Sequence, residues 1–426
     1  MARVVVIGAG AMGLAAGYYA LKRGHQVTVL EAAPEAGGMA AHFDLGGLSI
    51  ERFYHFVCKA DRPTFELLGE LGLGERMRWV ATSMGYYIDG RLETWGDPLS
   101  LLRFPKLSLI EKLRYGVMMA SAVRRRDASS LEQVSAKDWI TRWCGARVYG
   151  RLWAPLFKLK FYEYADNISA AWMWTRIKRL GTSRRSMFQE ELGYIDGGSE
   201  TLVHALVDVI TKRGGQVRLG TPASRVAVEA GRVAAVVAAA ETFPADAVIS
   251  TVPTPLVERL APDLPPNDLA RYRAIVNIGV VCVVFRLRRS VTPHFWVNIS
   301  DKRFEIPGIV EFSNLRPTGN TLVYIPYYMP VTNPKFARDD EAFRVESFGY
   351  LKLINPGLDE ADVIACHVGR LRHAQPVCPP GFAAMLPPIQ TAIAGLQIAD
   401  TCFYYPEDRG IAESVRLGKA MAERIA

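Results

Sequence analysis

The chain lacks the features that would assign it to several common classes of protein. Its six cysteines are scattered, and none belongs to a CxxC pair or has the spacing of zinc ligands, so no metal site is expected. No apolar run approaches the roughly 18 residues of a membrane-spanning helix, since the longest, around residues 274–285, is shorter and contains Asn277. A basic arm and a repeat of aromatic and basic residues are also missing, so nothing indicates a nucleic-acid partner.

Length and charge indicate the number of domains and the kinds of partner to expect. With 426 residues, 50% of them hydrophobic and 22% charged, the chain is typical of a globular protein with about two or three domains or one large discontinuous domain. Basic clusters at 124–126, 176–185 and 286–289 supply much of the net charge of +8. They are either solvated faces or a source of attraction for an anionic substrate or membrane surface. Because Met1 leads almost directly into the first predicted strand, no signal peptide is visible and we expect a cytoplasmic protein.

Glycines follow directly after the first predicted strand. The continuous apolar run at 4–7 predicts a strand buried on both faces of a parallel sheet. After the glycines come a helix that reaches Arg23, a second strand at 26–30 and the acidic Glu31. A GxGxxG motif at a strand-to-helix turn of a βαβ unit predicts a dinucleotide-binding site. Its glycines are Gly8, Gly10 and Gly13.

Each part of this motif has a chemical reason. Gly8 permits the tight turn, Gly10 lets the backbone approach a pyrophosphate, and Gly13 lets helix and strand pack closely. Free N–H groups at the start of the helix, where Ala11 and Met12 lie, favour negative charge. The carboxylate of Glu31 can accept hydrogen bonds from ribose hydroxyls and disfavours the 2′-phosphate of NADP.

A second glycine pair decides between NAD and FAD. Gly37 and Gly38 begin six residues beyond Glu31, and Gly17 extends the first motif to GxGxxGxxxG. The pair resembles the loop of the amine oxidase superfamily, in which the backbone passes close to the FAD phosphates and ribityl chain. We therefore expect FAD, bound non-covalently, as the cofactor.

From this point the sequence resembles the flavoprotein superfamily of monoamine oxidases, protoporphyrinogen oxidase, phytoene desaturases and, more distantly, UDP-galactopyranose mutase. The first matching block contains "GGLSIERFYHFV", and the resemblance implies that Tyr54 and His55 surround the flavin. In the block "YIDGGSETLVHALVDVITKRGGQVRLGTPASRV" it implies that the main chain of Val226 pairs with adenine. In the block "GLQIADTCFYYPEDRGIAESVRLGKAMA" it implies that Asp400 holds a ribityl hydroxyl and that the helix opened by Gly410 and Ile411 points N–H groups at the flavin pyrimidine.

The resemblance implies an α/β fold with a Rossmann-like FAD-binding domain of the glutathione-reductase type and a discontinuous α+β substrate domain. We assign residues 1–80, 190–260 and 385–426 to the first domain. The substrate domain would comprise a helical part, 81–189, and a sheet part, 261–384. The expected cofactor contacts are Gly8, Gly10, Ala11, Met12, Gly13, Glu31, Ala32, Gly38, Met39, His55, Val226, Asp400, Gly410 and Ile411.

Candidate substrate residues come from two clusters rich in aromatic and basic side chains. Arginine suits phosphate or carboxylate groups and aromatic rings supply stacking surfaces, although surface charge and core packing describe the same residues. The candidates are Trp172, Arg176, Arg184, Tyr324 and Tyr328. No sequence motif identifies a catalytic residue. The candidates for a role in the reaction at the flavin are His55, Tyr54 and Tyr327.

Two departures argue against an ordinary amine oxidase. Met39 follows the glycine pair where amine oxidases usually have arginine, and Asn277 stands where many of them have a lysine. We expect an FAD-dependent oxidoreductase that transfers a hydride between flavin N5 and a small-molecule, lipid-type or sugar-type intermediate. The alternative is a non-redox flavoenzyme that acts on a nucleotide sugar, as the mutase does.

The stretch at 98–126 mixes leucines with basic residues and allows contact with a membrane surface. Substrate, direction of transfer, electron acceptor and oligomeric state stay open.

Overall fold

The predicted βαβ unit lies at the centre of a five-stranded parallel sheet. The computed structural model describes residues 1–425. In it, β1 pairs in parallel with β2 on one side and with β14 on the other. The strand order is β10 (Gln216–Arg218), β2 (Gln26–Leu30), β1 (Arg3–Ile7), β14 (Ala247–Ser250) and β20 (Leu396–Ile398). Segments from both ends of the chain therefore meet in one sheet.

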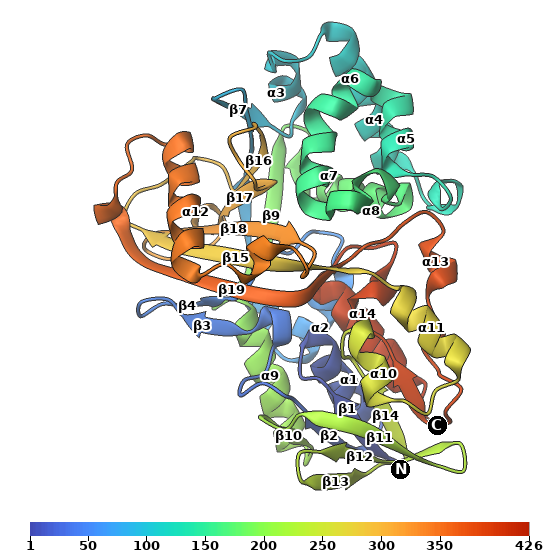
Figure 1. Cartoon of the computed structure of the whole chain (residues 1–426). Helices are drawn as coiled ribbons and strands as arrows, with labels where there is room; N and C mark the ends of the chain where they lie inside the picture. Colours follow the sequence, from blue (N-terminus) through green and yellow to red (C-terminus); the bar gives the residue numbers. More distant parts are fainter. Residues whose placement is uncertain (426) are drawn as a thin grey trace.

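The first and last long helices pack against each other beside this sheet. They are α1 (Ala11–Lys22) and α14 (Ile411–Glu423), and α9 (Ser199–Lys212) and α2 (Arg62–Glu70) flank them. A glycine makes the close approach possible, because a Cβ at Gly418 would lie 2.4 Å from the carbonyl oxygen of Met12. Figure 1 shows the two chain ends side by side at the bottom of the molecule.

A seven-stranded sheet forms the middle of the molecule (Figure 1). Its order is β19 (Val363–Pro376), β15 (Asn277–Leu287), β18 (Thr321–Met329), β17 (Gly308–Glu311), β16 (Trp296–Ser300), β6 (Met84–Ile88) and β7 (Arg91–Trp95). The helix α12 (Asp340–Ile354) packs against β15 and β19. Buried residues such as Phe285, Phe343 and Leu351 form a core of their own between sheet and helix.

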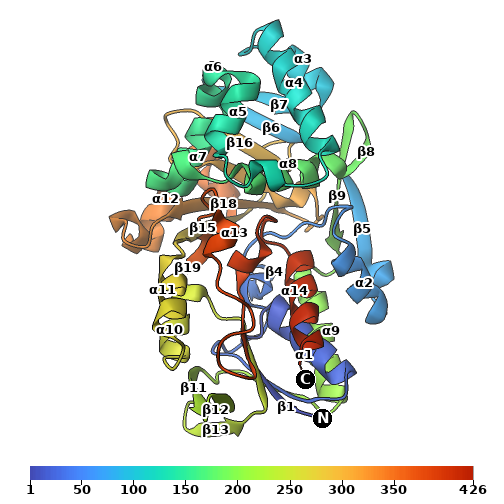
Figure 2. The same cartoon turned by 90° about the vertical axis from the view of Figure 1, so that its right-hand side faces the viewer.

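Helices cover the far side of this sheet and form the top of the molecule in both views (Figures 1 and 2). They are α3 (Pro98–Arg103), α4 (Leu109–Arg124), α5 (Ala136–Cys144), α6 (Ala146–Val148), α7 (Ala154–Phe161) and α8 (Ala170–Thr182). Side chains cap several of them. The hydroxyl of Ser108, for example, accepts a hydrogen bond from the N–H of Glu111 at the start of α4.

Smaller elements connect these layers. One three-stranded sheet consists of β11 (Ala223–Glu229), β12 (Arg232–Ala238) and β13 (Glu241–Pro244), and another of β5 (Met77–Thr82), β9 (Gln189–Ile195) and β8 (Arg184–Ser186). The remaining elements are β3 (His42–Asp44), β4 (Ser49–Glu51), α10 (Val257–Leu260), α11 (Pro266–Ala274) and α13 (Phe382–Met385).

The expected α/β fold with a parallel sheet is confirmed. The division into two discontinuous domains stays a prediction. All strands of the five-stranded sheet fall within 1–80, 190–260 and 385–426, and all strands of the seven-stranded sheet fall within 81–189 and 261–384.

Candidate functional site

A large cavity opens at the carboxyl ends of the parallel strands. It is lined by the last residues of β1 and β2, by the segments that follow β14 and β20, by the seven-stranded sheet and by the helical layer. Its volume is about 1140 Å³. Ligand pockets ordinarily measure about 300–1,000 Å³, so this one has room for a large ligand and a second molecule. The edge beyond the carboxyl ends is where open α/β sheets bind ligands.

The glycine motif forms one end of the cavity. A Cβ at Gly13 would lie 1.9 Å from the carbonyl oxygen of Gly8, and a Cβ at Gly8 would lie 2.4 Å from Oγ1 of Thr251. A Cβ at Gly10 would meet no protein atom nearer than 4.0 Å. Gly8 and Gly13 therefore serve packing within the protein, whereas the open side of Gly10 faces the cavity, which Ala11 and Met12 also line.

The second glycine pair lies against the first. The N–H of Gly37 donates to the carbonyl of Ala9 at 2.8 Å, and a Cβ at Gly38 would lie 3.2 Å from Cα of Gly10. Gly38 and Met39 both line the cavity. The two loops therefore present main chain, rather than side chains, to whatever lies between them.

Glu31 directly follows β2 and lines the cavity, as does its neighbour Ala32. Its Oε2 accepts a hydrogen bond from the N–H of Ala9 at 2.7 Å, and its Oε1 accepts one from the N–H of Ala33 at 2.9 Å. A carboxylate has about four acceptor positions. Glu31 can therefore hold both loops in place and still accept hydrogen bonds from ribose hydroxyls.

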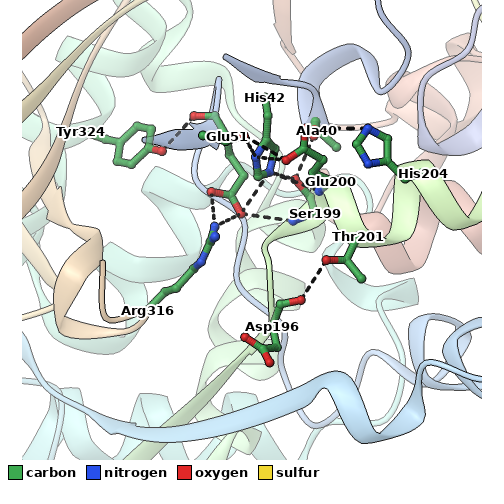
Figure 3. A network of polar contacts seen from close by, with 11 residues as sticks. Ala40, His42, Glu51, Asp196, Ser199, Glu200, Thr201, His204, Arg316 and Tyr324 are labelled. Atoms are coloured by element: carbon green, nitrogen blue, oxygen red, sulfur yellow. Dashed lines mark hydrogen bonds and ion pairs between the residues drawn. The ribbon is translucent and has the colours of Figure 1, made fainter. Parts of the chain in front are cut away.

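A buried polar network holds the segments beside this end of the cavity (Figure 3). Both carboxylate oxygens of Glu51, on β4, accept from Nη1 of Arg316, at 3.2 and 3.1 Å. Burial opposes the charge of Glu51, but the neighbouring His42 and the charge of Arg316 hold its pKa below the usual range. Ser199, at the start of α9, donates from its N–H to Glu51 and from its hydroxyl to the carbonyl of the cavity-lining Ala40. The network thus fixes the glycine-pair loop against α9 and the seven-stranded sheet.

The C-terminal block supplies a second carboxylate and a second helix start. Asp400 lines the cavity and accepts hydrogen bonds from the N–H groups of Thr254, at 2.7 Å, and Cys402, at 2.9 Å. Burial raises the pKa of Asp400, although these N–H groups oppose the shift. Gly410 and Ile411, at the start of α14, line the cavity as well. The N-termini of the first and last helices thus open onto the same space.

The opposite end of the cavity is lined by large side chains. Tyr54 and His55 line the cavity too, and Nδ1 of His55 is buried without a hydrogen-bond partner among the described residues. Burial lowers the pKa of His55. The cavity is also lined by four of the residues expected to contact substrate, namely Trp172, Arg176, Arg184 and Tyr328.

The structure places two predicted tyrosines elsewhere. Tyr324 is fully buried and donates its hydroxyl to the carbonyl of Glu51 at 2.8 Å. Tyr327 points to the opposite face of β18 from Tyr328, because side chains alternate along a strand, and its hydroxyl pairs with that of Ser347 at 2.8 Å. Neither residue lines the cavity, so we no longer count Tyr327 among the catalytic candidates.

Val226 also lies away from the cavity. It is fully buried within β11 and pairs with Val236 of β12. Ala223, at the start of the same strand, lines the cavity instead. The strand β11 therefore reaches the cavity at Ala223 rather than at Val226, and the contact with adenine stays a prediction.

Other cavity residues escaped the sequence reasoning. They include Lys160 on α7, Asp408 and Arg409 before α14, and several residues of β19. Lys160 stands between two phenylalanines of the helix, which is the only local hint. Asp408 forms an ion pair with Arg176.

A parallel βαβ sheet with a glycine-lined cavity and two helix N-termini at its edge defines a dinucleotide-binding protein. The profile of the family described as "Flavin containing amine oxidoreductase" matches residues 13–347, and the chain belongs to this family. FAD is therefore the cofactor, and the open side of Gly10, the carboxylates of Glu31 and Asp400 and the starts of α1 and α14 fit it.

Individual relatives are distant. The chain is 25% identical over 281 residues to the 15-cis-phytoene desaturase of Capsicum annuum, a match that covers 61% of this chain and 48% of the relative. It therefore spans about half the length of the curated relatives it matches. An oxidoreductase from Methanosarcina mazei has a similar structure, with a TM-score of 0.73, 20% identity and coverage of 99% and 100%. The structure of reduced UDP-galactopyranose mutase is also similar, with a TM-score of 0.76 and 15% identity, and the match covers 99% of this chain and 95% of the mutase. These structures establish the fold alone.

Among residues 1–425, no helix combines the length and apolar character needed to cross a membrane.

Proposed function

We propose that the protein is an FAD-dependent oxidoreductase that transfers a hydride between flavin N5 and a C–H bond or activated double bond of a small pathway intermediate. When bound, FAD supplies the redox chemistry. The residues of the chain bind it, orient the substrate and exclude water. One observation carries the proposal: the starts of α1 and α14, from opposite ends of the chain, open onto one cavity together with Gly10 and Gly38.

Each cofactor contact has a physical role in this proposal. The N–H groups at the start of α1 would hold the pyrophosphate, with no side chain at Gly10 in the way. Glu31 and Asp400 would accept hydrogen bonds from ribose and ribityl hydroxyls. The main chain at Ala223, rather than at Val226, would meet the adenine.

Tyr54 and His55 remain the candidates for a direct role in the reaction. Both line the cavity. The buried Nδ1 of His55 has no partner among the described residues, so it is free to exchange a hydrogen bond or a proton with a bound group.

The test begins with the purified protein and its visible spectrum. A yellow protein that releases FAD on denaturation is expected, and a colourless protein that does not take up added FAD would refute the proposal. Pathway metabolites are then added under anaerobic conditions. Loss of the absorbance of oxidised flavin identifies a substrate that is oxidised, and its recovery in prereduced protein identifies one that is reduced.

The same experiment separates the alternative function. A mutase-like enzyme would convert a nucleotide sugar only after prior reduction and would consume no electrons during turnover. Product formed by prereduced protein with no change in flavin absorbance would favour that alternative. The cationic groups at the aromatic end of the cavity would also suit a diphosphate.

A further inference from the structure

Charged side chains gather at the end of the cavity that the helical layer forms. Lys160 on α7, Arg176 on α8 and Arg409 before α14 all line it, and Asp408 lies among them. These three cationic groups and one carboxylate are half-buried and leave an excess of positive charge at this end of the cavity. Such an excess is costly unless an anion completes it.

Lys160 shows most clearly that a partner is missing. Its Nζ lies 5.0 Å from the ring centroid of Tyr328, 5.3 Å from that of Trp172 and 5.5 Å from that of Phe161. Among the described residues it makes no hydrogen bond and no ion pair. Burial and the neighbouring Arg176 lower the pKa of Lys160 well below its ordinary value. The aromatic rings hold the amine in place, but they offer no oxygen or nitrogen to accept a hydrogen bond from its three N–H donors.

The other charged residues cannot satisfy this lysine. Asp408 accepts from Arg176 through Oδ2, while its Oδ1 is buried without a partner among the described residues. Arg409 donates to the carbonyl of Ala374, and its Nε is also buried without a partner. Burial by itself would raise the pKa of Asp408, but the three neighbouring cations together lower it. The carboxylate of Asp408 is thus shared among three cationic groups and cannot neutralise Lys160 alone.

Large apolar side chains surround the charged group. Trp153, Leu156 and Phe157 of the helical layer line the cavity beside it, as do Met119 and Met173. A ligand that fits this end must therefore combine an apolar body with an oxyanion.

We propose that this end of the cavity binds an amphipathic anion, whose carboxylate or phosphate contacts Lys160 and Arg176 and whose apolar body lies against the aromatic side chains. This rests on the proposed function, since the anion would be the substrate.

Binding of model anions to the FAD-loaded protein tests the proposal without any turnover. Isothermal titration calorimetry compares dodecanoate, dodecyl phosphate and the uncharged dodecanol. At least one anion should bind about tenfold or more tightly than dodecanol, and the stronger of the two identifies carboxylate or phosphate. Lys160→Met should weaken anion binding about 10- to 100-fold, because a charge-assisted hydrogen bond is lost, and should leave dodecanol within about twofold.

Controls keep the result interpretable. Lys158→Met removes an exposed lysine from the same helix and should change nothing. Arg176→Met would leave Asp408 without its partner, so the double variant Arg176→Met/Asp408→Asn is used, and it too should lose anion binding. Equal affinity of wild type for dodecanol and both anions, or unchanged anion binding by Lys160→Met, would overturn the proposal. A colourless protein would refute the flavoenzyme function instead, and tryptophan fluorescence would still report anion binding.

A separate surface carries a second inference. Six large apolar side chains are exposed on α3 and the first half of α4, and the most exposed are Leu109, Ile110 and Leu113, at 72%, 73% and 68%. The others are Leu99, Leu102 and Val117. Figure 2 shows α3 and α4 at the end of the molecule farthest from the two chain termini. Patches of this kind mark interaction sites.

The charges around this apolar patch favour a bilayer. Arg103, Arg124 and Arg126 are exposed and have no ion pair among the described residues, whereas Glu111 is paired with Arg147. Of these, Arg103 directly follows the exposed Leu102, whereas Arg124 and Arg126 lie at the other end of α4. An unpaired arginine beside exposed leucines suits the anionic headgroups and the acyl region of a membrane surface. The inner side of α4 lines the cavity through Met119. We infer that the α3–α4 patch docks on an anionic membrane.

Sedimentation with vesicles tests this docking. The protein should sediment with vesicles of phosphatidylcholine and phosphatidylglycerol, less with phosphatidylcholine alone, and high salt should release it. Ile110→Ser/Leu113→Ser should reduce binding about tenfold or more, while Val345→Ser, an exposed apolar residue on α12, should not. Equal binding of the double variant and wild type would refute the inference. So would a wild-type dimer that the double variant dissociates, because the patch would then cover a second copy.

Discussion

The two ends of the cavity are built from different material. The cofactor end presents main chain and small residues, such as Gly10, Ala11 and Gly38, whereas the opposite end presents Lys160, Trp172 and other large side chains. Main-chain groups serve a part of the ligand that does not vary, because every FAD has the same pyrophosphate. Side chains can be exchanged one at a time without disturbing a turn, so the opposite end can be specialised for a particular substrate.

The largest test of this difference is to add one methyl group at the cofactor end. In Gly10→Ala the new Cβ meets no protein atom nearer than 4.0 Å, so the fold should be kept. The methyl group would nevertheless occupy the side that the pyrophosphate needs, and we expect FAD affinity to fall on the order of 100-fold, as loss of charge-assisted hydrogen bonds would give. Titration of apoprotein with FAD measures it, and melting temperature checks the fold.

Gly69→Ala is the matched control, because a Cβ there has nothing within 4 Å and the residue lies on α2, away from the cavity. Wild-type FAD affinity in Gly10→Ala would show that the cofactor does not approach this loop, and the comparison between the two ends would fail.

The next largest effect concerns the helix pair that joins the two chain ends. In Gly418→Ala the Cβ would lie 2.4 Å from the carbonyl oxygen of Met12, so α1 and α14 must separate. We expect the free energy of unfolding to fall by about 1–3 kcal/mol, the usual cost of overpacking. Gly349→Ala on α12 should have the opposite sign, because the site is open and alanine favours a helix by about 0.5–1 kcal/mol. Urea unfolding measures both, and equal effects would show that the α1–α14 contact is not tight.

The seven-stranded sheet should respond to pH through one buried carboxyl. Burial raises the pKa of Glu311 to about 7, although Ser290 and two N–H groups donate to it. The folded state then binds a proton more tightly than the unfolded state does. Its contribution to stability is full below the unfolded pKa of about 4.5 and is lost as pH rises toward 7.

Between pH 5 and pH 7 the wild type should lose about 1–2 kcal/mol more stability than Glu311→Gln, whose side chain does not titrate. Urea unfolding at the two pH values checks this difference. A wild-type profile parallel to that of the variant would mean that Glu311 is ionised in the folded protein throughout this range.

The contrast between the cofactor end and the aromatic end of the cavity also explains which features could be predicted from the sequence. The turn after β1 needs glycines at fixed spacing, so the βαβ unit and its ligand could be read from about thirty neighbouring residues. β15 coincides with the longest apolar run of the chain, around residues 274–285. β19 carries histidines and arginines on a half-exposed face and has no such run, so no pattern in the sequence marks it as a strand.

The aromatic end could not be predicted in the same way. Lys160 and Arg409 are separated by about 250 residues of chain, and only tertiary packing, including that of α7 against β18, brings them to one cavity. Ala223 illustrates a finer limit. Ala223 lines the cavity at the start of β11, next to a register shift between Ala223 and Arg225, and such an irregularity has no sequence pattern of its own.

The smallest expected effect comes from a side chain at the cofactor end. In Glu31→Gln one oxygen can still accept from Ala9 or Ala33, but the new amide group faces an N–H donor and can no longer accept. We expect FAD affinity to fall about three- to tenfold, in line with one hydrogen bond of about 0.5–1.5 kcal/mol. Titration of apoprotein measures it, with the exposed Glu66→Gln as control. If main chain carries the cofactor end, this loss stays well below that of Gly10→Ala, and an equal or larger loss would show that the carboxylate, not the glycine loop, dominates FAD binding.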